Sequence, residues 1–318
     1  MNRSPKIILI MFRRESRGES CGLIHKKYSK KGKTGGFGDM GREENITTFQ
    51  NTEKMCKENI RLKAAIEKSI ALQQMILESD VIPEQNKKKY DLSAQIIVSK
   101  KRSYEAAEAY KNQSVCVHNF ASASTPGGGV VHGANAQEEC LCRCSDLYFC
   151  LNTPEMWNGF YKAHRNAKNP IHNDDIIYTP EVVVFKTDTA YPQVMPETDW
   201  YNVNVITCAA PNLRERPSNL FNSGDGNKAA MISDEELKVI HEKRLRRILD
   251  VAFLNGNEVV ILGAFGCGAF LNNPEVVAQA ANTVIEEYKY AFKAIEFAVY
   301  CGSGDARNYR IFSEIISE

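Results

Sequence analysis

Residues 119–145 read NFASASTPGGGVVHGANAQEECLCRCS, and three kinds of local structure meet in this stretch. Its first residues overlap the apolar run VCVHNF at 115–120, which is typical of a short buried strand. Three successive glycines at 127–129 favour a loop, because glycine loses the most backbone entropy on ordering. Residues 137–151 predict a helix that begins with Gln-Glu-Glu. We therefore expect a strand, a glycine loop and an acidic helix start, in that order.

Two interpretations of this stretch are open on local chemistry alone. Acidic residues are favoured in a first helical turn because they complement the helix dipole, so a tight connection would explain Glu138 and Glu139. Successive glycines can also let a backbone pass very close to a ligand, with its N–H groups free to point at it. The distance and order of the two motifs decide between these readings, since residues 130–136 separate the third glycine from Gln137.

The run PGGGVVHGANAQEE at 126–139 resembles the signature of the poly(ADP-ribose) glycohydrolases, in which three glycines are followed a few residues later by QEE. Its form is similar to the bacterial-type branch, whose fold is a macrodomain. Residues 263–274 (GAFGCGAFLNNP) resemble that branch's diphosphate loop, and residues 206–214 (ITCAAPNLR) are a third similar stretch. The resemblance extends over residues 40–318, and it implies a macrodomain with a helical N-terminal extension at 45–90.

The resemblance also implies roles for individual residues. Glu139 matches the glutamate that protonates the leaving 2′-oxygen and then activates a water, which requires a pKa raised by burial and by the neighbouring Glu138. Glu138 matches the glutamate that orients ribose hydroxyls, and Gln137 is expected to fix the loop. The expected substrate-binding residues are Asn119, Gly127, Gly128, Gly129, Val130, Gln137, Gly266, Cys267, Gly268, Ala269 and Phe270. His132 lies in the loop, but the family signature does not require it.

The second glycine stretch could also suggest a dinucleotide-binding fold. That pattern needs a third glycine at position 271, after Gly266 and Gly268, and the residue there is Leu271. A phosphate cradle fits better, because backbone N–H groups that precede a helix start form an anion site. Phe270 either packs on a ribose, as the resemblance implies, or belongs to the core, and only the backbone of Cys267 is expected to matter.

Composition indicates a soluble globular protein, with 43% hydrophobic and 25% charged residues in a chain of 318. Its net charge of +1 gives no global signal for a nucleic-acid or membrane partner. Its ten cysteines form no C-x-x-C pair, which predicts no zinc site and a reducing, cytoplasmic location. Strand and helix patterns alternate along the chain, so we predict an α/β domain with three layers and a mixed central sheet.

Residues 1–39 differ from the rest of the chain. They hold ten Lys and Arg and three Asp and Glu, a net charge of +7 that leaves −6 for the remainder, and they show no helical or strand period. We expect a disordered basic tail. Gly35 and Gly36 can be encoded by a ribosome-binding sequence at a suitable distance from Met40, so our hypothesis is that translation starts at Met40.

The apolar periodicity predicts the remaining elements. Helices are expected at 51–79, 103–111, 156–165, 234–254 and 275–292, and strands at 95–99, 174–180, 181–186, 202–208, 258–262 and 295–301. Residues 306–316 are expected to be a C-terminal segment that packs or frays. Thr47 and Thr48 are candidate caps of the first helix, and Pro180 is expected to break a strand. The basic run 243–247 is interpreted as a solvated helix face. Arg143 is expected mainly to pack, with bracing of the acidic pair as the alternative.

The resemblance predicts a glycoside hydrolase that cleaves ribose–ribose O-glycosidic bonds in poly(ADP-ribose) and releases ADP-ribose, with no metal or redox cofactor. Its expected partners are poly(ADP-ribose) or ADP-ribosylated proteins, with no membrane and no direct nucleic-acid contact. A hydrolase of mono-ADP-ribose on protein or nucleic-acid acceptors remains an alternative, as does a non-catalytic ADP-ribose reader. The reader is less favoured, because an acidic pair facing an anionic ligand is costly without a catalytic use. A nicotinamide-dependent oxidoreductase is disfavoured by the glycine spacing.

Overall fold

The computed structural model describes residues 41–219, 224–302 and 305–316. The basic tail predicted for 1–39 and the start predicted at Met40 lie outside these residues. Seven strands form one sheet in the order β1-β4-β5-β3-β6-β7-β2. The strands are β1 (Gln74–Ile76), β2 (Gln95–Ser99), β3 (Val115–Phe120), β4 (Ile176–Val184), β5 (Tyr201–Cys208), β6 (Val259–Leu262) and β7 (Ala294–Ala298).

The sheet is mixed, as predicted. The five strands β5, β3, β6, β7 and β2 run parallel, whereas β4 is antiparallel to β5 and β1 is antiparallel to β4. Val117 at the centre pairs with Val205 on one side and Ile261 on the other. These strands are apolar runs because parallel strands are covered on both faces. Their carboxyl ends lie along one edge, which gathers the loops that follow them.

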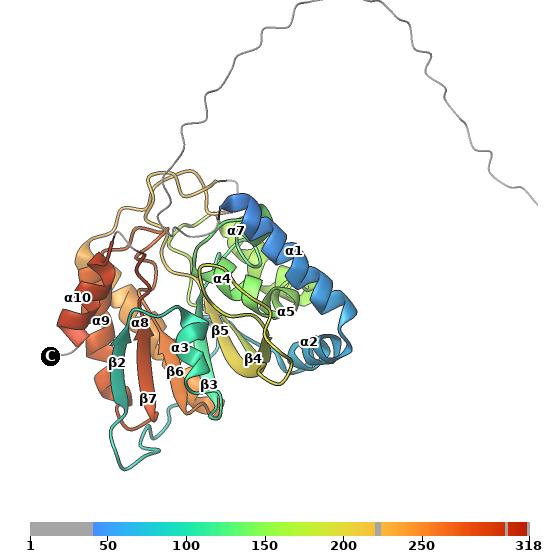
Figure 1. Cartoon of the computed structure of the whole chain (residues 1–318). Helices are drawn as coiled ribbons and strands as arrows, with labels where there is room; N and C mark the ends of the chain where they lie inside the picture. Colours follow the sequence, from blue (N-terminus) through green and yellow to red (C-terminus); the bar gives the residue numbers. More distant parts are fainter. Residues whose placement is uncertain (1–40, 220–223, 303–304, 317–318) are drawn as a thin grey trace, which may run out of the picture. The chain divides into compact units, whose positions relative to one another are not determined.

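Helices cover both faces of the sheet, so the three-layer prediction is confirmed. The longer helices are α1 (Arg42–Glu58), α2 (Ile60–Leu72), α4 (Gln137–Cys144), α8 (Asp234–Leu254), α9 (Pro274–Ile285) and α10 (Arg307–Ile316). The shorter ones are α3 (Ser103–Glu108), α5 (Leu147–Leu151), α6 (Pro154–Met156) and α7 (Lys162–Ala167), with single turns η1 (Val130–His132), η2 (Trp157–Tyr161) and η3 (Glu286–Tyr288). Helices α8, α9 and α10 lie on one side of the sheet, and α1, α2 and α4 on the other (Figure 1).

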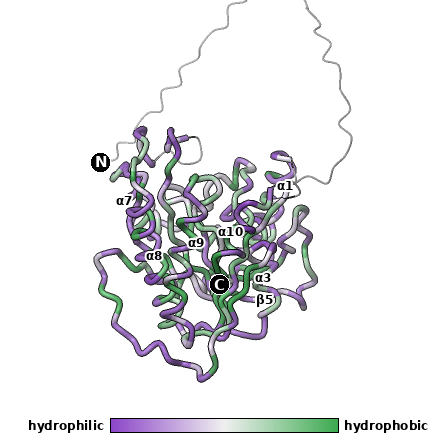
Figure 2. Tube along the Cα trace, turned by 90° about the vertical axis from the view of Figure 1, so that its left-hand side faces the viewer, coloured by the Kyte–Doolittle hydropathy of each residue, from purple (hydrophilic) through white to green (hydrophobic). Residues whose placement is uncertain are grey.

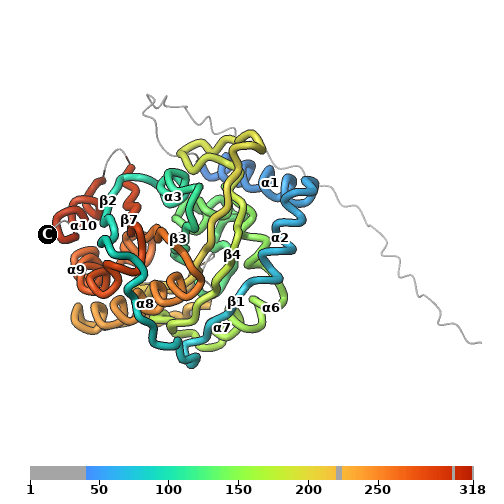
Figure 3. The backbone as a smooth tube through the Cα atoms, turned by 90° about the horizontal axis from the view of Figure 1, so that it is seen from below, coloured from blue at the N-terminus to red at the C-terminus, as the bar shows by residue number. Residues whose placement is uncertain are grey.

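Two apolar clusters fill the spaces between the layers. Val115 and Val117 of β3 belong to the cluster under α1, α2 and α4, whereas Cys116 between them belongs to the cluster under α8 and α9. This alternation follows from the pleat of the strand, which sends successive side chains to opposite faces. The view from below shows the sheet between its two helical layers (Figure 3), and the hydrophobic segments run through the middle of the fold (Figure 2).

The predicted N-terminal helical region differs in its bounds. The first helix begins at Arg42 with Gly41 before it, so Thr47 and Thr48 lie inside the helix and do not cap it. Asn59 then separates α1 from α2, and its side chain caps α2 by accepting a hydrogen bond from the Leu62 amide at 3.1 Å. Helix α2 ends at Leu72, and residues 74–76 join the sheet as β1. The extension predicted for 45–90 is therefore helical only in its first part.

The helix predicted over 137–151 is interrupted at Ser145. This residue is extended, with φ of −143°, and it forms an isolated bridge with Val184 next to the end of β4. The Ser145 hydroxyl donates to the Leu141 carbonyl at 2.8 Å, and the Asp146 carboxylate accepts from the Val183 amide at 2.9 Å. Pairing with a distant strand thus overrides the local helical preference, which sequence periodicity does not reveal.

Pro180 does not divide β4 into two strands. The strand is continuous from Ile176 to Val184, and its register against β5 shifts between Thr179 and Val182. Glu181 takes up the irregularity with a φ of 57°. A bulge of this kind accommodates the missing proline N–H while the strand continues.

The solvated-face interpretation of residues 243–247 is wrong for Arg244, whose side chain is buried. Its guanidinium donates to the Asp174 carboxylate at 2.7 Å and to the carbonyls of Ile171 and Ala209 at 2.8 Å each. Burial opposes ionisation of Asp174. Hydrogen bonds from Lys243 and Arg244 outweigh this effect, so the pKa of Asp174 is lowered. Arg244 therefore joins α8 to the loop that follows β5.

We expect Arg244→Gln to lower the free energy of unfolding by about 3–5 kcal/mol, because it removes the buried partner of the buried Asp174 carboxylate. The neighbouring Lys243 also contacts Asp174, but its side chain is 60% exposed, so Lys243→Gln is the matched control and should cost below about 1 kcal/mol. Urea unfolding of both variants measures the difference. Equal losses would contradict this assignment.

Candidate active site

The loops that follow β3, β5, β6 and β7 surround a cavity of about 630 Å³. This is the edge at which ligands bind in open α/β sheets. Eight of the predicted site residues line the cavity: Gly128, Gln137, Glu138, Glu139, Gly266, Gly268, Ala269 and Phe270. The other five predicted residues, Asn119, Gly127, Gly129, Val130 and Cys267, do not line it.

Glu138 is 2% exposed and sits at the start of α4. One carboxylate oxygen accepts a hydrogen bond from the Ser122 amide at 2.7 Å, and the other accepts from the Asn119 side-chain amide at 3.3 Å. Burial, and then the charge of Glu139, raise the pKa of Glu138 well above its usual range. Asn119 also donates to the Thr207 hydroxyl at 3.2 Å. The buried Asn119 side chain therefore supports Glu138 without lining the cavity itself.

Glu139 is 6% exposed and is held by the backbone on both sides. One oxygen accepts from the Gly129 amide at 2.8 Å, and the other accepts from the Ala136 amide at 2.9 Å. Burial raises the pKa of Glu139, while these amide hydrogen bonds and the charge of Arg143 partly oppose the rise. The result is a carboxyl that lines the cavity, is harder to ionise than an exposed glutamate and has a fixed orientation.

The glycine loop approaches both carboxylates closely. Gly128 has a φ of +55°, and a Cβ atom on it would lie 2.5 Å from a Glu139 oxygen and 3.1 Å from a Glu138 oxygen. Gly127 also has a positive φ, and a Cβ there would lie 2.7 Å from the Tyr148 ring. The requirement for glycine at these two positions is therefore both conformational and steric.

Gln137 connects helix α4 to two neighbouring elements. Its side-chain oxygen accepts from the Phe120 amide at 2.9 Å, and its nitrogen donates to the His118 carbonyl at 2.8 Å and to the Ser103 hydroxyl at 3.0 Å. These contacts fix the start of α4 against the end of β3 and the start of α3. The expectation that Gln137 fixes the glycine loop stays a prediction, because these contacts reach β3 and α3.

Arg143 does more than pack. Its buried guanidinium donates to the Ala134 carbonyl at 2.6 Å and to the Asn135 side chain at 2.5 Å, so it braces the segment that leads into the acidic pair. Helix α1 supports the same segment from outside, because Arg42 donates to the His132 carbonyl at 2.8 Å and Asn45 donates to the Gly133 carbonyl at 3.2 Å. The His132 side chain is exposed and does not line the cavity.

The second glycine loop forms the facing wall. Gly266 has a φ of +77°, and a Cβ on it would lie 2.7 Å from the Ala210 side chain. Asn272 donates to the carbonyls of Pro211 and Phe270 at 2.6 and 3.2 Å, and it contacts His241 at 2.7 Å. These contacts join the loop after β6 to the loop after β5 and to α8. Leu271, which ends the glycine pattern, has a φ of 60° and is exposed.

Among the side chains of the cavity wall that sequence reasoning missed are Arg102, Asp188, Arg214 and Tyr300. The Arg102 guanidinium lies 3.9 Å from the centre of the Tyr300 ring and donates to the Cys140 sulfur at 3.3 Å. Asp188 accepts from the Tyr104 amide at 2.9 Å, and burial raises its pKa to about 6. These residues are distant in sequence, so only the "AAPNLR" resemblance pointed toward any of them.

Within residues 41–219, 224–302 and 305–316, no three His, Cys, Asp or Glu side chains gather in a way that would hold a metal ion. None of the helices in that part of the chain is long and apolar enough to cross a membrane.

Comparisons with known proteins agree with this geometry. Residues 43–187 match the model of the family "Microbial-type PARG, catalytic domain", where PARG denotes poly(ADP-ribose) glycohydrolase. No curated protein sequence matches the chain.

Solved structures of bacterial PARGs share the fold. The enzyme from Thermomonospora curvata is 24% identical over 86% of this chain and 99% of its own, with a TM-score of 0.73. Its complex with the inhibitor ADP-HPD gives 25% identity, the same coverage and a TM-score of 0.71. The Deinococcus radiodurans enzyme in complex with ADP-ribose is 28% identical over 79% of this chain and 96% of its own, with a TM-score of 0.65. Residues 43–187 therefore resemble the catalytic domain of the microbial-type poly(ADP-ribose) glycohydrolases, and the chain shares the fold of the bacterial enzymes.

Proposed function

We propose that this protein hydrolyses the ribose–ribose O-glycosidic bonds of poly(ADP-ribose) and releases ADP-ribose. The observation that carries the proposal is the pair of buried carboxyls, Glu138 and Glu139, on a cavity wall that faces a second glycine loop. The match to the microbial-type PARG family model supports this reaction, and the similar Deinococcus structure holds ADP-ribose. We also infer that the fold is a macrodomain and that the catalytic domain begins near Met40.

Glu139 is the proposed acid and base. In its protonated form it gives its proton to the departing 2′-oxygen while the bond from that oxygen to the anomeric carbon breaks. The carboxylate that remains is stabilised by the amides of Gly129 and Ala136 and by the charge of Arg143. It then takes a proton from a water whose oxygen bonds to the positively charged anomeric carbon. A raised pKa suits the first step, and the amide donors suit the second.

Glu138 has a different part. Its oxygens are held by Ser122 and Asn119, so it cannot rotate to replace Glu139. We assign it the orientation of ribose hydroxyl groups beside the reacting carbon. Its proximity to Glu139 also favours retention of a proton by the pair, because two buried carboxylates repel each other.

The facing loop supplies a place for phosphate. Gly266, Gly268, Ala269 and Phe270 line the cavity just before α9, whose first turn begins at Pro274. Backbone N–H groups near a helix start attract anions. We propose that this loop binds the diphosphate and that Phe270 packs on a ribose, while Cys267 contributes only backbone.

Two candidate reactions differ in the acceptor from which ADP-ribose is released. A hydrolase of mono-ADP-ribose would use the same cavity, since the terminal unit has the same chemistry on either acceptor. We favour the polymer because residues 43–187 match the model of a poly(ADP-ribose) glycohydrolase family. We further propose a cytoplasmic location, on the basis of nine cysteines that are unpaired among the described residues.

We expect Glu139→Gln to lower kcat for ADP-ribose release from poly-ADP-ribosylated protein by roughly 10²–10⁴-fold, because an amide cannot transfer the proton. ADP-ribose binding should survive in the variant. Chromatographic quantification of ADP-ribose measures release, and calorimetry measures binding.

Cys142→Ser is a suitable control, because Cys142 is buried on the same helix, does not line the cavity and plays no part in the mechanism. It should retain release. Unchanged release by Glu139→Gln would contradict the assignment. A parent protein that binds ADP-ribose but releases none from the polymer would indicate a reader or a hydrolase of another linkage, which mono-ADP-ribosylated protein and DNA would then distinguish.

Gly128→Ala should reduce release strongly while the protein stays folded. The new methyl group would meet the carboxylates of Glu138 and Glu139, and the positive φ would cost about 1 kcal/mol. Gly256→Ala is the matched control, since Gly256 also has a positive φ of +74°, nothing lies within 4 Å of its Cβ position, and it does not line the cavity. The measurement is release rate beside the midpoint of thermal unfolding. Similar activity in both variants would show that close approach of the loop is not needed.

A further inference from the structure

Arg214 has no part in the mechanism so far, yet its side chain lines the cavity on the loop that follows β5. Its guanidinium carbon lies 5.4 Å from the centre of the Phe270 ring, beside the proposed phosphate loop. Of the cavity-lining residues in the described part of the chain, only Arg102 and Arg214 are cationic. Arg102 already contacts Cys140 and Tyr300.

The guanidinium of Arg214 is held on one side only. Its Nε donates to the Asn212 side-chain oxygen at 3.0 Å, and one terminal nitrogen, Nη2, donates to the Pro217 carbonyl at 3.0 Å. For the other terminal nitrogen, Nη1, residues 41–219, 224–302 and 305–316 offer no hydrogen bond. Burial lowers the pKa of Arg214, and the charge of Asp225 partly opposes this. A half-buried cation with donors to spare is stabilised by an anion.

Asn212 is the fixed point of this arrangement. Its side chain is fully buried, and its amide nitrogen donates to the Pro217 carbonyl at 3.1 Å and to the Asp225 carboxylate at 2.8 Å. Its backbone amide donates to the Pro170 carbonyl at 2.7 Å. Asn212 therefore orients its oxygen toward Arg214, while it anchors the loop to the segment before β4.

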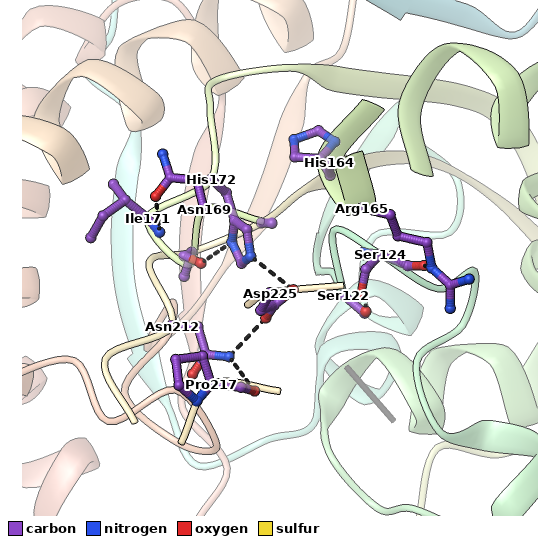
Figure 4. A network of polar contacts seen from close by, with 12 residues as sticks. Ser122, Ser124, His164, Arg165, Asn169, Ile171, His172, Asn212, Pro217 and Asp225 are labelled. Atoms are coloured by element: carbon purple, nitrogen blue, oxygen red, sulfur yellow. Dashed lines mark hydrogen bonds and ion pairs between the residues drawn. The ribbon is translucent and has the colours of Figure 1, made fainter. Parts of the chain in front are cut away.

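A buried histidine and aspartate complete the support (Figure 4). His172 Nδ1 contacts the Ala210 carbonyl at 2.8 Å, and because a carbonyl only accepts, this nitrogen carries a hydrogen. The other ring nitrogen lies 3.3 Å from the Asp225 carboxylate. The two side chains are both buried, so the His172 ring packs against Asp225 and fixes the carboxylate that accepts from Asn212.

We propose that Arg214 is a substrate-binding residue that contacts the diphosphate of the bound ADP-ribose unit, and that His172, Asp225 and Asn212 are the positioning residues that hold it there. A planar guanidinium matches phosphate oxygens with two donors at once. The diphosphate must lie in one cavity with the acidic pair, and Arg214 on the facing side offsets that repulsion. This inference rests on the proposed function and deepens it.

Arg214→Gln should weaken ADP-ribose binding by roughly ten- to a hundredfold and raise KM similarly, with kcat within a few-fold of the parent, because the lost interaction is to the phosphates and not to the reacting bond. Calorimetry with ADP-ribose gives the affinity. Arg216→Gln is the matched control, since Arg216 is exposed on the same loop, does not line the cavity and carries the same charge. It should bind as the parent does. Adenosine, which lacks phosphate, should bind parent and Arg214→Gln equally.

The positioning residues have their own pair of variants. Asp225→Asn can still accept from Asn212 and donate to a neutral His172, so it should keep ADP-ribose affinity close to that of the parent. Asp225→Ala should weaken binding as Arg214→Gln does, and the double variant Arg214→Gln/Asp225→Ala should be no weaker than either single one. Equal losses in Asp225→Asn and Asp225→Ala would overturn the positioning role.

Two results separate the failure of this inference from that of the proposed function. A parent protein that neither binds ADP-ribose nor releases it overturns the proposed function and this inference with it. A parent that binds and cleaves, beside an Arg214→Gln variant of unchanged affinity, overturns this inference alone. An equal loss of adenosine binding would show that Arg214 acts on the shape of the cavity and not on phosphate.

Discussion

The site depends on one constraint, which is the burial of two adjacent carboxyls at the start of a single helix. Two such groups are stable there only if backbone donors reach them, and the amides of Ser122, Gly129 and Ala136 do so. This arrangement forces the preceding loop to fold back onto the helix start, which explains the positive φ at Gly128 and the absence of room for a side chain. The environment of the two carboxyls and the conformation of the glycine loop therefore depend on each other. The free-energy cost of burial appears as raised pKa values, which is the property that an acid catalyst requires.

The rest of the fold holds this arrangement from several directions. The strand order brings four loops to one edge of the sheet, and Gln137 fixes helix α4 to the central strand β3. Arg143 and helix α1 support the outer half of the glycine loop. Arg244 and the His172–Asp225 pair secure the loop after β5 on the other side. Buried charges in this protein thus serve mainly to join loops to the layers that flank the sheet, in addition to the chemistry of the carboxyl pair.

Local sequence predicts several features of the fold and the site, and the features that it does not predict depend on contacts between distant residues. Neighbouring residues encode the glycine loop, the helix start at Gln137 and the helix at 234–254. The start of the second element and both bounds of the third agree with the prediction. The interruption at Ser145 and the continuous strand through Pro180 depend on pairing with distant strands, which periodicity does not report. Arg244 was misjudged because a basic run has the same appearance in solvent and against a buried aspartate. Arg214 was not identified, because its place in the cavity depends on contacts with Asn212 and Phe270.

The central claim is that burial keeps the carboxyl of Glu139 protonated above the ordinary carboxyl range. Carbon-13 NMR of the glutamate side chains, recorded against pH, tests it directly, and Glu139→Gln assigns the resonance. The account predicts a Glu139 titration above the usual value of about 4.3, coupled to that of Glu138. A Glu139 carboxyl that titrates at or below that value would contradict the account, because it would be ionised at neutral pH and could not deliver the proton that the reaction needs.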